Sequence, residues 1–194
     1  MKKTQFTVLL LVCLAASTMA QEKKSEMPAG VWGAYLKQSK HCQEQMEALL
    51  QAIPQEKFGW RPMEGVRSIA ESFMHTALGN YMILSKVGGT VPQGVDMKAL
   101  ETSTTDKAKI TEALKKSFEA VNQGVLSVKE ADFTKSVDFF GMNMTVLDMI
   151  MLGATHQHEL LGQQIAYARM NKVVPPWTEE MQKKMKEQPQ KKGN

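Results

Sequence analysis

Residues 68–87 read SIAESFMHTALGNYMILSKV and are followed directly by Gly88 and Gly89. Ser68 and Glu71 form a Ser-x-x-Glu capping box, in which both side chains accept hydrogen bonds from backbone amides at a helix start. Apolar side chains then recur at helical spacing, at Phe73, Met74, Ala77, Leu78, Tyr81 and Leu84. The pattern predicts an amphipathic helix that begins at Ser68, buries one face in a core and ends before the two glycines.

Three further stretches have the same helical period, and the predicted spans are 32–53, 106–123 and 145–171. Pro54 ends the first of these helices, because a proline disfavours helical geometry at the residue before it. Thr145 and Asp148 repeat the capping pattern at the start of the last one. Residues 128–141 alternate too loosely to assign. Four amphipathic helices bury their apolar stripes most simply as an all-α four-helix bundle.

The first twenty residues are typical of a cleavable secretory signal peptide. Lys2 and Lys3 precede an apolar run over 6–16, and Ala20 lies before the expected cut at Gln21. The run is too short for a bilayer span of roughly twenty residues, so no stable membrane anchor is expected after cleavage. The sequence thus predicts an exported protein, periplasmic or extracellular. Its expected division is a signal peptide over 1–20, a mature domain over 21–177, and a basic, frayed tail with a short helix over 178–194.

The charge of the chain is nearly balanced, with 24 Lys and Arg against 20 Asp and Glu. Nucleic-acid binding requires a dense basic surface, so no nucleic-acid partner is expected. Cys42 is the one thiol left after cleavage and lies on the apolar face of 32–53, where we expect a buried core residue, whereas His41 lies off that face and should be solvated. The oligomeric state, monomer or homodimer, and the identity of a small-molecule or protein partner stay open.

Histidines and carboxylates on two predicted helices are the residues that could carry chemistry. Glu71 and His75 share a helix face, as do His156 and Glu159, whereas His158 lies about 200° around the helix from His156. Apolar neighbours favour the His158 face as the core face, but which of the two histidines faces the bundle interior stays open. Such residues at helical spacing build metal sites in bundle cores. A capping role for Glu71 and a core or boundary role for each histidine explain the same residues without a metal.

Methionine is frequent, with fifteen in the chain. Four of them cluster around the start of the last predicted helix, at Met142, Met144, Met149 and Met151. Thioethers are soft ligands, so copper binding by an exported protein is one hypothesis. The alternative is that these side chains fill gaps in an apolar core.

Two separated motifs resemble those of DinB-like four-helix-bundle proteins. The first is the run from Ile53 to Pro62, followed by Gly65–Glu71 and His75. The second comprises His156, Gly162, Gln163, Tyr167, Arg169, Asn171 and Val174–Pro176. The resemblance covers about Trp32 to Trp177. It implies an up-up-down-down bundle related to metal-dependent hydrolases and to thiol S-transferases that use bacillithiol or mycothiol.

The resemblance also implies a divalent ion, zinc or nickel, held by one His on the second helix and a His-x-x-x-His pair on the fourth. His75 matches the first ligand and His156 the second, but Leu160 occupies the third position. Two histidines alone would hold the metal weakly, unless Glu159 substitutes. The leading hypothesis is therefore an exported binding or accessory protein with at most a degenerate metal site. The alternatives are a metal-dependent enzyme that uses His75, His156 and Glu159, and a copper-binding protein.

Overall fold

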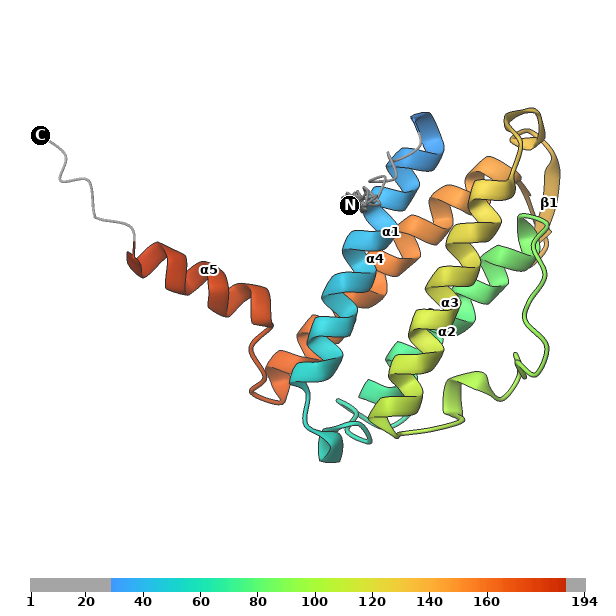
Figure 1. Ribbon diagram of the computed structural model, residues 1–194. Helices are drawn as coiled ribbons and strands as arrows, with labels where there is room; N and C mark the ends of the chain where they lie inside the picture. Colours follow the sequence, from blue (N-terminus) through green and yellow to red (C-terminus); the bar gives the residue numbers. More distant parts are fainter. Residues whose placement is uncertain (1–28, 188–194) are drawn as a thin grey trace, which may run out of the picture.

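The computed structural model of the chain describes residues 29–187, so the expected signal peptide and residues 188–194 lie outside the described residues. Four long helices form the bundle (Figure 1): α1 Gly30–Ala52, α2 Ile69–Lys86, α3 Lys107–Ser127 and α4 Val146–Met170. These are the four helices that the periodicity predicts. A two-stranded hairpin lies before α4, and a fifth helix, α5 Pro176–Glu187, follows it. Among helices of the described range, none combines the length and the apolar character needed to cross a bilayer.

Capping fixes where three of the helices begin. At α2 the Ser68 hydroxyl accepts from the Glu71 amide at 3.2 Å, and the Glu71 carboxylate accepts from the Ser68 amide at 2.7 Å. Thr145 and Asp148 form the same reciprocal pair at α4. Asp106 caps α3 through the amide of Lys109. These bonds satisfy amide donors that a helix start leaves without intrahelical partners, and they confirm both predicted capping boxes.

The predicted up-up-down-down order of helix directions is wrong. The end of α1 meets the start of α3, because the Gln55 side chain bonds Thr105 and Lys107. Asn80 of α2 contacts Ser117 of α3, and Leu84 lies against Gly124 further along both helices, so α2 and α3 run parallel. Helices α1 and α4 run the opposite way (Figure 1), which gives up-down-down-up. The cause is the connection over residues 88–106, which returns along the length of the bundle and lets two parallel helices be neighbours.

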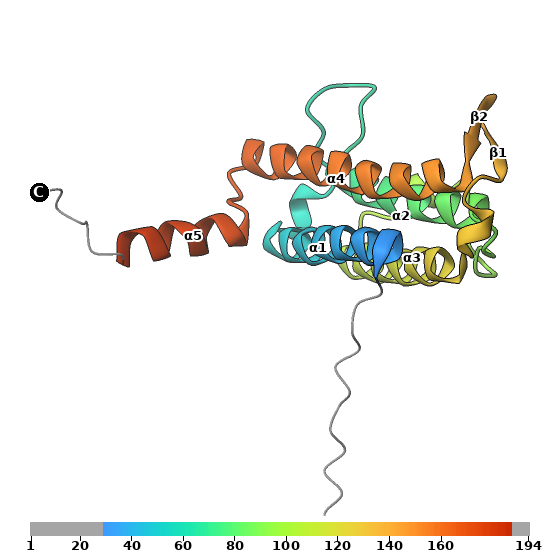
Figure 2. The ribbon, with the colours of Figure 1, turned by 90° about the horizontal axis from the view of Figure 1, so that it is seen from above.

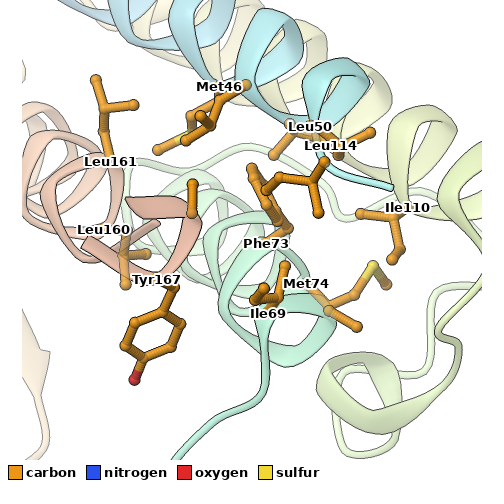
Figure 3. Close-up of a cluster of buried hydrophobic side chains, with 14 of the residues drawn as sticks. Met46, Leu50, Ile69, Phe73, Met74, Ile110, Leu114, Leu160, Leu161 and Tyr167 are labelled. Atoms are coloured by element: carbon orange, nitrogen blue, oxygen red, sulfur yellow. The ribbon is translucent and has the colours of Figure 1, made fainter. Parts of the chain in front are cut away.

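Two apolar clusters fill the bundle, one toward each end. The first lies at the end where α2 and α3 begin, and the side chains labelled in Figure 3 belong to it: Met46, Leu50, Ile69, Phe73, Met74, Ile110, Leu114, Leu160, Leu161 and Tyr167. The second surrounds Tyr35, Leu84, Val121 and Ile150 at the other end. Cys42 is fully buried in the first cluster and His41 is exposed, both as predicted.

The unassigned stretch contains a short antiparallel hairpin, β1 Ser136–Phe139 and β2 Met142–Thr145, in which Val137 pairs with Met144. Phe140 and Gly141 form its two-residue turn. Lys86 at the end of α2 donates to the Asp138 carbonyl at 2.7 Å. Figure 2 shows the hairpin at the end of the bundle where α4 begins, whereas α5 extends away from the opposite end. The hairpin is therefore attached to the ends of α2 and α4, the two helices that carry His75 and His156.

Candidate functional site

The register between α2 and α4 places the candidate residues opposite one another. Gln157 of α4 donates to the Asn80 side chain of α2 at 2.9 Å. Two turns later Gln164 donates to the Thr76 hydroxyl at 3.1 Å and to the Ser72 carbonyl at 3.2 Å. All these side chains are buried, so the contacts fix how the two antiparallel helices slide against each other.

His75 and His156 meet across this interface. Their ring centroids are 5.3 Å apart, with the ring planes nearly perpendicular at 78°. Gly79 makes the approach possible, because a Cβ built there would lie 2.8 Å from Cδ2 and 2.9 Å from Nε2 of His156. The missing side chain at Gly79 thus lets the imidazole of α4 pack on the backbone of α2.

A carboxylate orients His75 from behind. Glu101, in the short helix η2 Leu100–Thr102, lies with Oε2 2.7 Å from Nδ1 of His75, and Arg67 Nε donates to Oε1 of Glu101 at 2.6 Å. Burial raises the pKa of Glu101, but hydrogen bonds from Arg67 and His75 outweigh it and hold the pKa below its ordinary value. The ionised carboxylate accepts, so His75 donates from Nδ1 and its Nε2 is left for a ligand.

The second imidazole has no such support. The Nδ1 atom of His156 is 3.7 Å from Oε2 of Glu159, which is too long for a hydrogen bond. Burial, with a smaller repulsion from His75, lowers the pKa of His156 below its ordinary 6.5. The ring is therefore neutral at pH 7 and keeps one nitrogen as an acceptor.

A cavity of about 400 Å³ opens beside the two imidazoles. Apart from His75, His156 and Gly79, its walls are apolar: Leu78, Met82 and Ile83 of α2, Leu152 of α4, and Phe139 and Phe140 of the hairpin. The volume is within the range of small-molecule sites, and few convergent polar groups in an apolar wall are typical of them. The bundle and the hairpin together therefore form a largely apolar pocket that two imidazoles border.

Comparisons with known proteins agree with this architecture. A family profile of the DinB superfamily matches residues 38–163, which is more than half of the chain. The chain belongs to the DinB superfamily. No curated protein matches it significantly.

Two solved structures of DinB-like proteins share the fold. One, from Bacillus cereus, superposes with a TM-score of 0.63 at 20% sequence identity and covers 73% of this chain and 93% of its own. The other, from Bacillus subtilis, has a TM-score of 0.55 at 16% identity and covers 74% of this chain and 92% of its own. At these identities the likeness establishes the DinB-like fold alone.

The position at which the sequence resemblance implies a third metal ligand holds an apolar side chain. Leu160 is 5% exposed and packs in the first apolar cluster. The side chain of Glu159 is 79% exposed and next to His156, not between the two imidazoles. Among the residues from 29 to 187, no three His, Cys, Asp or Glu side chains are grouped as metal ligands. The structure therefore brings His75 and His156 together without a third ligand.

The sequence leaves open whether His156 or His158 faces the bundle interior, although apolar neighbours favour the His158 face, and the structure places His158 on the outside. His158 is exposed at the edge of α4 that faces α1, where Nε2 lies 3.0 Å from Oε1 of Gln38 and the ring centroid lies 6.4 Å from that of His41. The buried stripe of α4 lies between the two histidine faces and contains Gln157 and Gln164. Because polar residues lie at the centre of this buried stripe, a search for apolar residues at helical spacing does not identify it.

The structure also shows where the remaining residues singled out from the sequence lie. Glu71 caps α2, as the capping alternative states, and its carboxylate also accepts from Arg61 at 3.1 Å. Met149 is completely buried, whereas Met151 is 54% exposed and about 200° around α4, so these two sulfurs do not face one copper site. Sequence reasoning missed Glu101, in a turn-rich segment without periodicity, and Gly79, although glycine inside a helical pattern is a recognisable signal of close approach.

Proposed function

We propose that this chain is an exported binding or accessory protein of the DinB superfamily, with a small-molecule pocket beside His75 and His156 and at most a weak divalent-metal site. One observation carries the proposal: two imidazoles meet at an apolar cavity where a buried leucine, Leu160, stands in place of the third ligand. The donor set supports ligand recognition better than tight metal binding.

The residues present do not fit a catalytic zinc or nickel ion. Such a site needs three protein ligands and an open position for water. His75 and His156 supply two ring nitrogens, and the exposed Glu159 would have to turn inward and lose its hydration to supply an oxygen. We therefore expect a divalent ion to be held weakly.

Titration calorimetry with Zn²⁺ and with Ni²⁺ tests this proposal on residues 21–194. We expect weak heats that a His75→Ala variant reduces further. His158→Ala is the matched control, because it removes an imidazole from the outer edge of the same helix α4. Tight, stoichiometric binding by the unmodified protein that His75→Ala abolishes would reject the degenerate site.

Export is the other part of the proposal, and its support is the leader-like sequence over 1–20. Expression with the native leader should give a mature protein that begins at Gln21. N-terminal mass spectrometry measures this directly. An intact leader on a membrane-bound product would refute both the cleavage and the released form.

One observation favours the enzyme alternative. The hydrogen bond from His75 Nδ1 to Glu101 is the arrangement by which a carboxylate orients an imidazole for metal binding or for proton transfer. In that alternative His75, His156 and Glu159 would hold an ion that activates water. The same tight titration that rejects the degenerate site would support it.

A further inference from the structure

We propose that Phe140, at the tip of the hairpin, is a specificity-determining residue, and that the pocket takes a small molecule with a flat apolar body and a single hydroxyl group. The inference rests on the proposed binding function and names the ligand class of that pocket. Two properties of Phe140, its backbone conformation and its exposure, carry it.

The backbone at Phe140 is in a region that side chains of its kind avoid. Its φ is 53° and that of Gly141 is 80°, so both central residues of the two-residue turn have positive φ, as in a type I′ hairpin turn. Asn-Gly is the preferred pair in such turns, because asparagine tolerates the left-handed conformation. A phenylalanine there strains the turn that it forms.

The side chain of Phe140 gains little burial in return. It is 77% exposed, and its ring contacts Phe139 edge to face at a centroid distance of 4.7 Å. The hairpin does not depend on this ring, because strand pairing and the bond from Lys86 to Asp138 hold it in place. A strained and exposed aromatic residue is thus unfavourable on two counts for the free protein, and such outliers point to a functional contact.

The functional contact expected of Phe140 is with a ligand in the pocket. Phe139 and Phe140 form the hairpin side of the cavity, across from Leu152 and the two imidazoles. Two aromatic rings beside an aliphatic wall suit a flat apolar body, which a ring can cover by stacking. A ligand that enters would bury part of Phe140, so the apolar surface exposed in the free protein would be covered in the complex.

The polar end of the ligand follows from the imidazoles. His75 uses Nδ1 to bond Glu101, and the ring of His156 beside it can offer one donor and one acceptor nitrogen. A hydroxyl group both donates and accepts, so it can pair with either ring whichever tautomer is present. Without it, a bound ligand would cover ring nitrogens and leave them unpaired, which costs affinity.

The probe is 2-naphthol, a flat bicyclic molecule with one hydroxyl, with 2-methoxynaphthalene as the probe that cannot donate. We expect 1:1 binding of 2-naphthol in calorimetry and weaker binding of the methoxy compound. Phe140→Asn should lower the affinity for 2-naphthol by about 2- to 10-fold, which is the contribution expected of one aromatic contact. The same variant should raise Tm by about 2–4 °C, because asparagine relieves the turn. Phe140→Trp, which keeps an aromatic ring at this position, should bind 2-naphthol about as tightly as the unmodified protein does.

Two control variants separate the possible results. Met63→Asn removes another exposed apolar side chain that does not line the pocket and should leave binding unchanged. Leu152→Gln alters the cavity wall itself and should lower the affinity for 2-naphthol. If Leu152→Gln weakens binding but Phe140→Asn does not, the role of Phe140 is refuted while the proposed binding function stands.

Other outcomes are equally decisive. A Phe140→Asn variant with a lower Tm would show that the residue supports the hairpin, and would overturn the inference. Equal affinity for both probes would refute the hydroxyl part of the ligand class. Failure of the unmodified protein to bind either probe, or binding that Leu152→Gln does not weaken, would overturn the inference together with the proposed pocket.

Discussion

Replacing Leu160 with histidine tests the metal site most directly. Leu160 lies between Gln157, which contacts Asn80, and Gln164, which contacts Thr76. The antiparallel register therefore places residue 160 opposite the turn of α2 that contains His75. A histidine there stands one turn from His156 on the same helix face, and it would complete three imidazoles from two helices.

The variant should lose stability without metal and regain much of it with metal. Leu160 is 5% exposed, and burying a leucine side chain contributes about 1.5–3 kcal/mol, so the apo variant should lose roughly that much. At about 2–4 °C per kcal/mol for a domain of this size, Tm should fall by roughly 3–12 °C. The added ligand should raise zinc affinity at least about tenfold, since even second-shell partners are worth 10- to 100-fold.

Calorimetry measures the affinity, and thermal unfolding measures the recovery. Zinc at about 100 times its Kd should return roughly 2.7 kcal/mol, close to the loss. Leu161→His is the matched control, because Leu161 is 4% exposed in the same cluster but points in a different direction from α4 (Figure 3). It should lose similar stability and gain no affinity. No gain from Leu160→His would refute the register argument, and an equal gain in Leu161→His would show that any added histidine suffices.

Cys42 is fully buried, and burial raises the pKa of its thiol to about 12, so Ellman's reagent should label it only in denaturant; rapid labelling of the native protein would contradict this. Gly79→Ala should displace the His156 ring, seen as shifted imidazole signals in NMR, and should not raise Tm although alanine favours a helix by about 1 kcal/mol. A bond from the Ser68 amide is the main cause that lowers the pKa of Glu71, so its stabilising effect is present above about pH 4.5 and is lost as the pH falls through the lowered pKa. Glu71→Gln should flatten the acid limb of the stability curve, and an unchanged limb in urea titrations would count against this linkage.

The helices could be predicted because each carries its own signal. Ser68 with Glu71, and Thr145 with Asp148, are local capping pairs whose partners lie three residues away, so no tertiary information is needed. The directions of the helices, in contrast to their positions in the sequence, are not encoded by local signals. They depend on which helix ends meet, and the contact of Gln55 with Thr105 joins residues that no local pattern relates.

The site was predicted in part for the same reason. His75 and His156 were found through the family resemblance, but which histidine of α4 faces α2 depends on Gln157 and Gln164. These amides are buried because each finds a partner across the interface, and a hydrophobic pattern counts them as surface residues. The turn at Phe140 was missed because its strands are only four residues long, too short for alternation to stand out.

The bond between Glu101 and His75 has two explanations, and the fold separates them. A carboxylate behind an imidazole is what a metal ligand needs, which would favour an ion at His75. Yet Glu101 belongs to the long connection that lets α2 and α3 run parallel, and Arg67, at the entrance to α2, clamps the same carboxylate at 2.6 Å. The three side chains therefore anchor the connection to α2 whether or not a metal binds. Because that anchoring would retain Glu101 without a metal, the leucine at position 160 is the more discriminating feature, and it favours the binding protein over the metal-dependent enzyme.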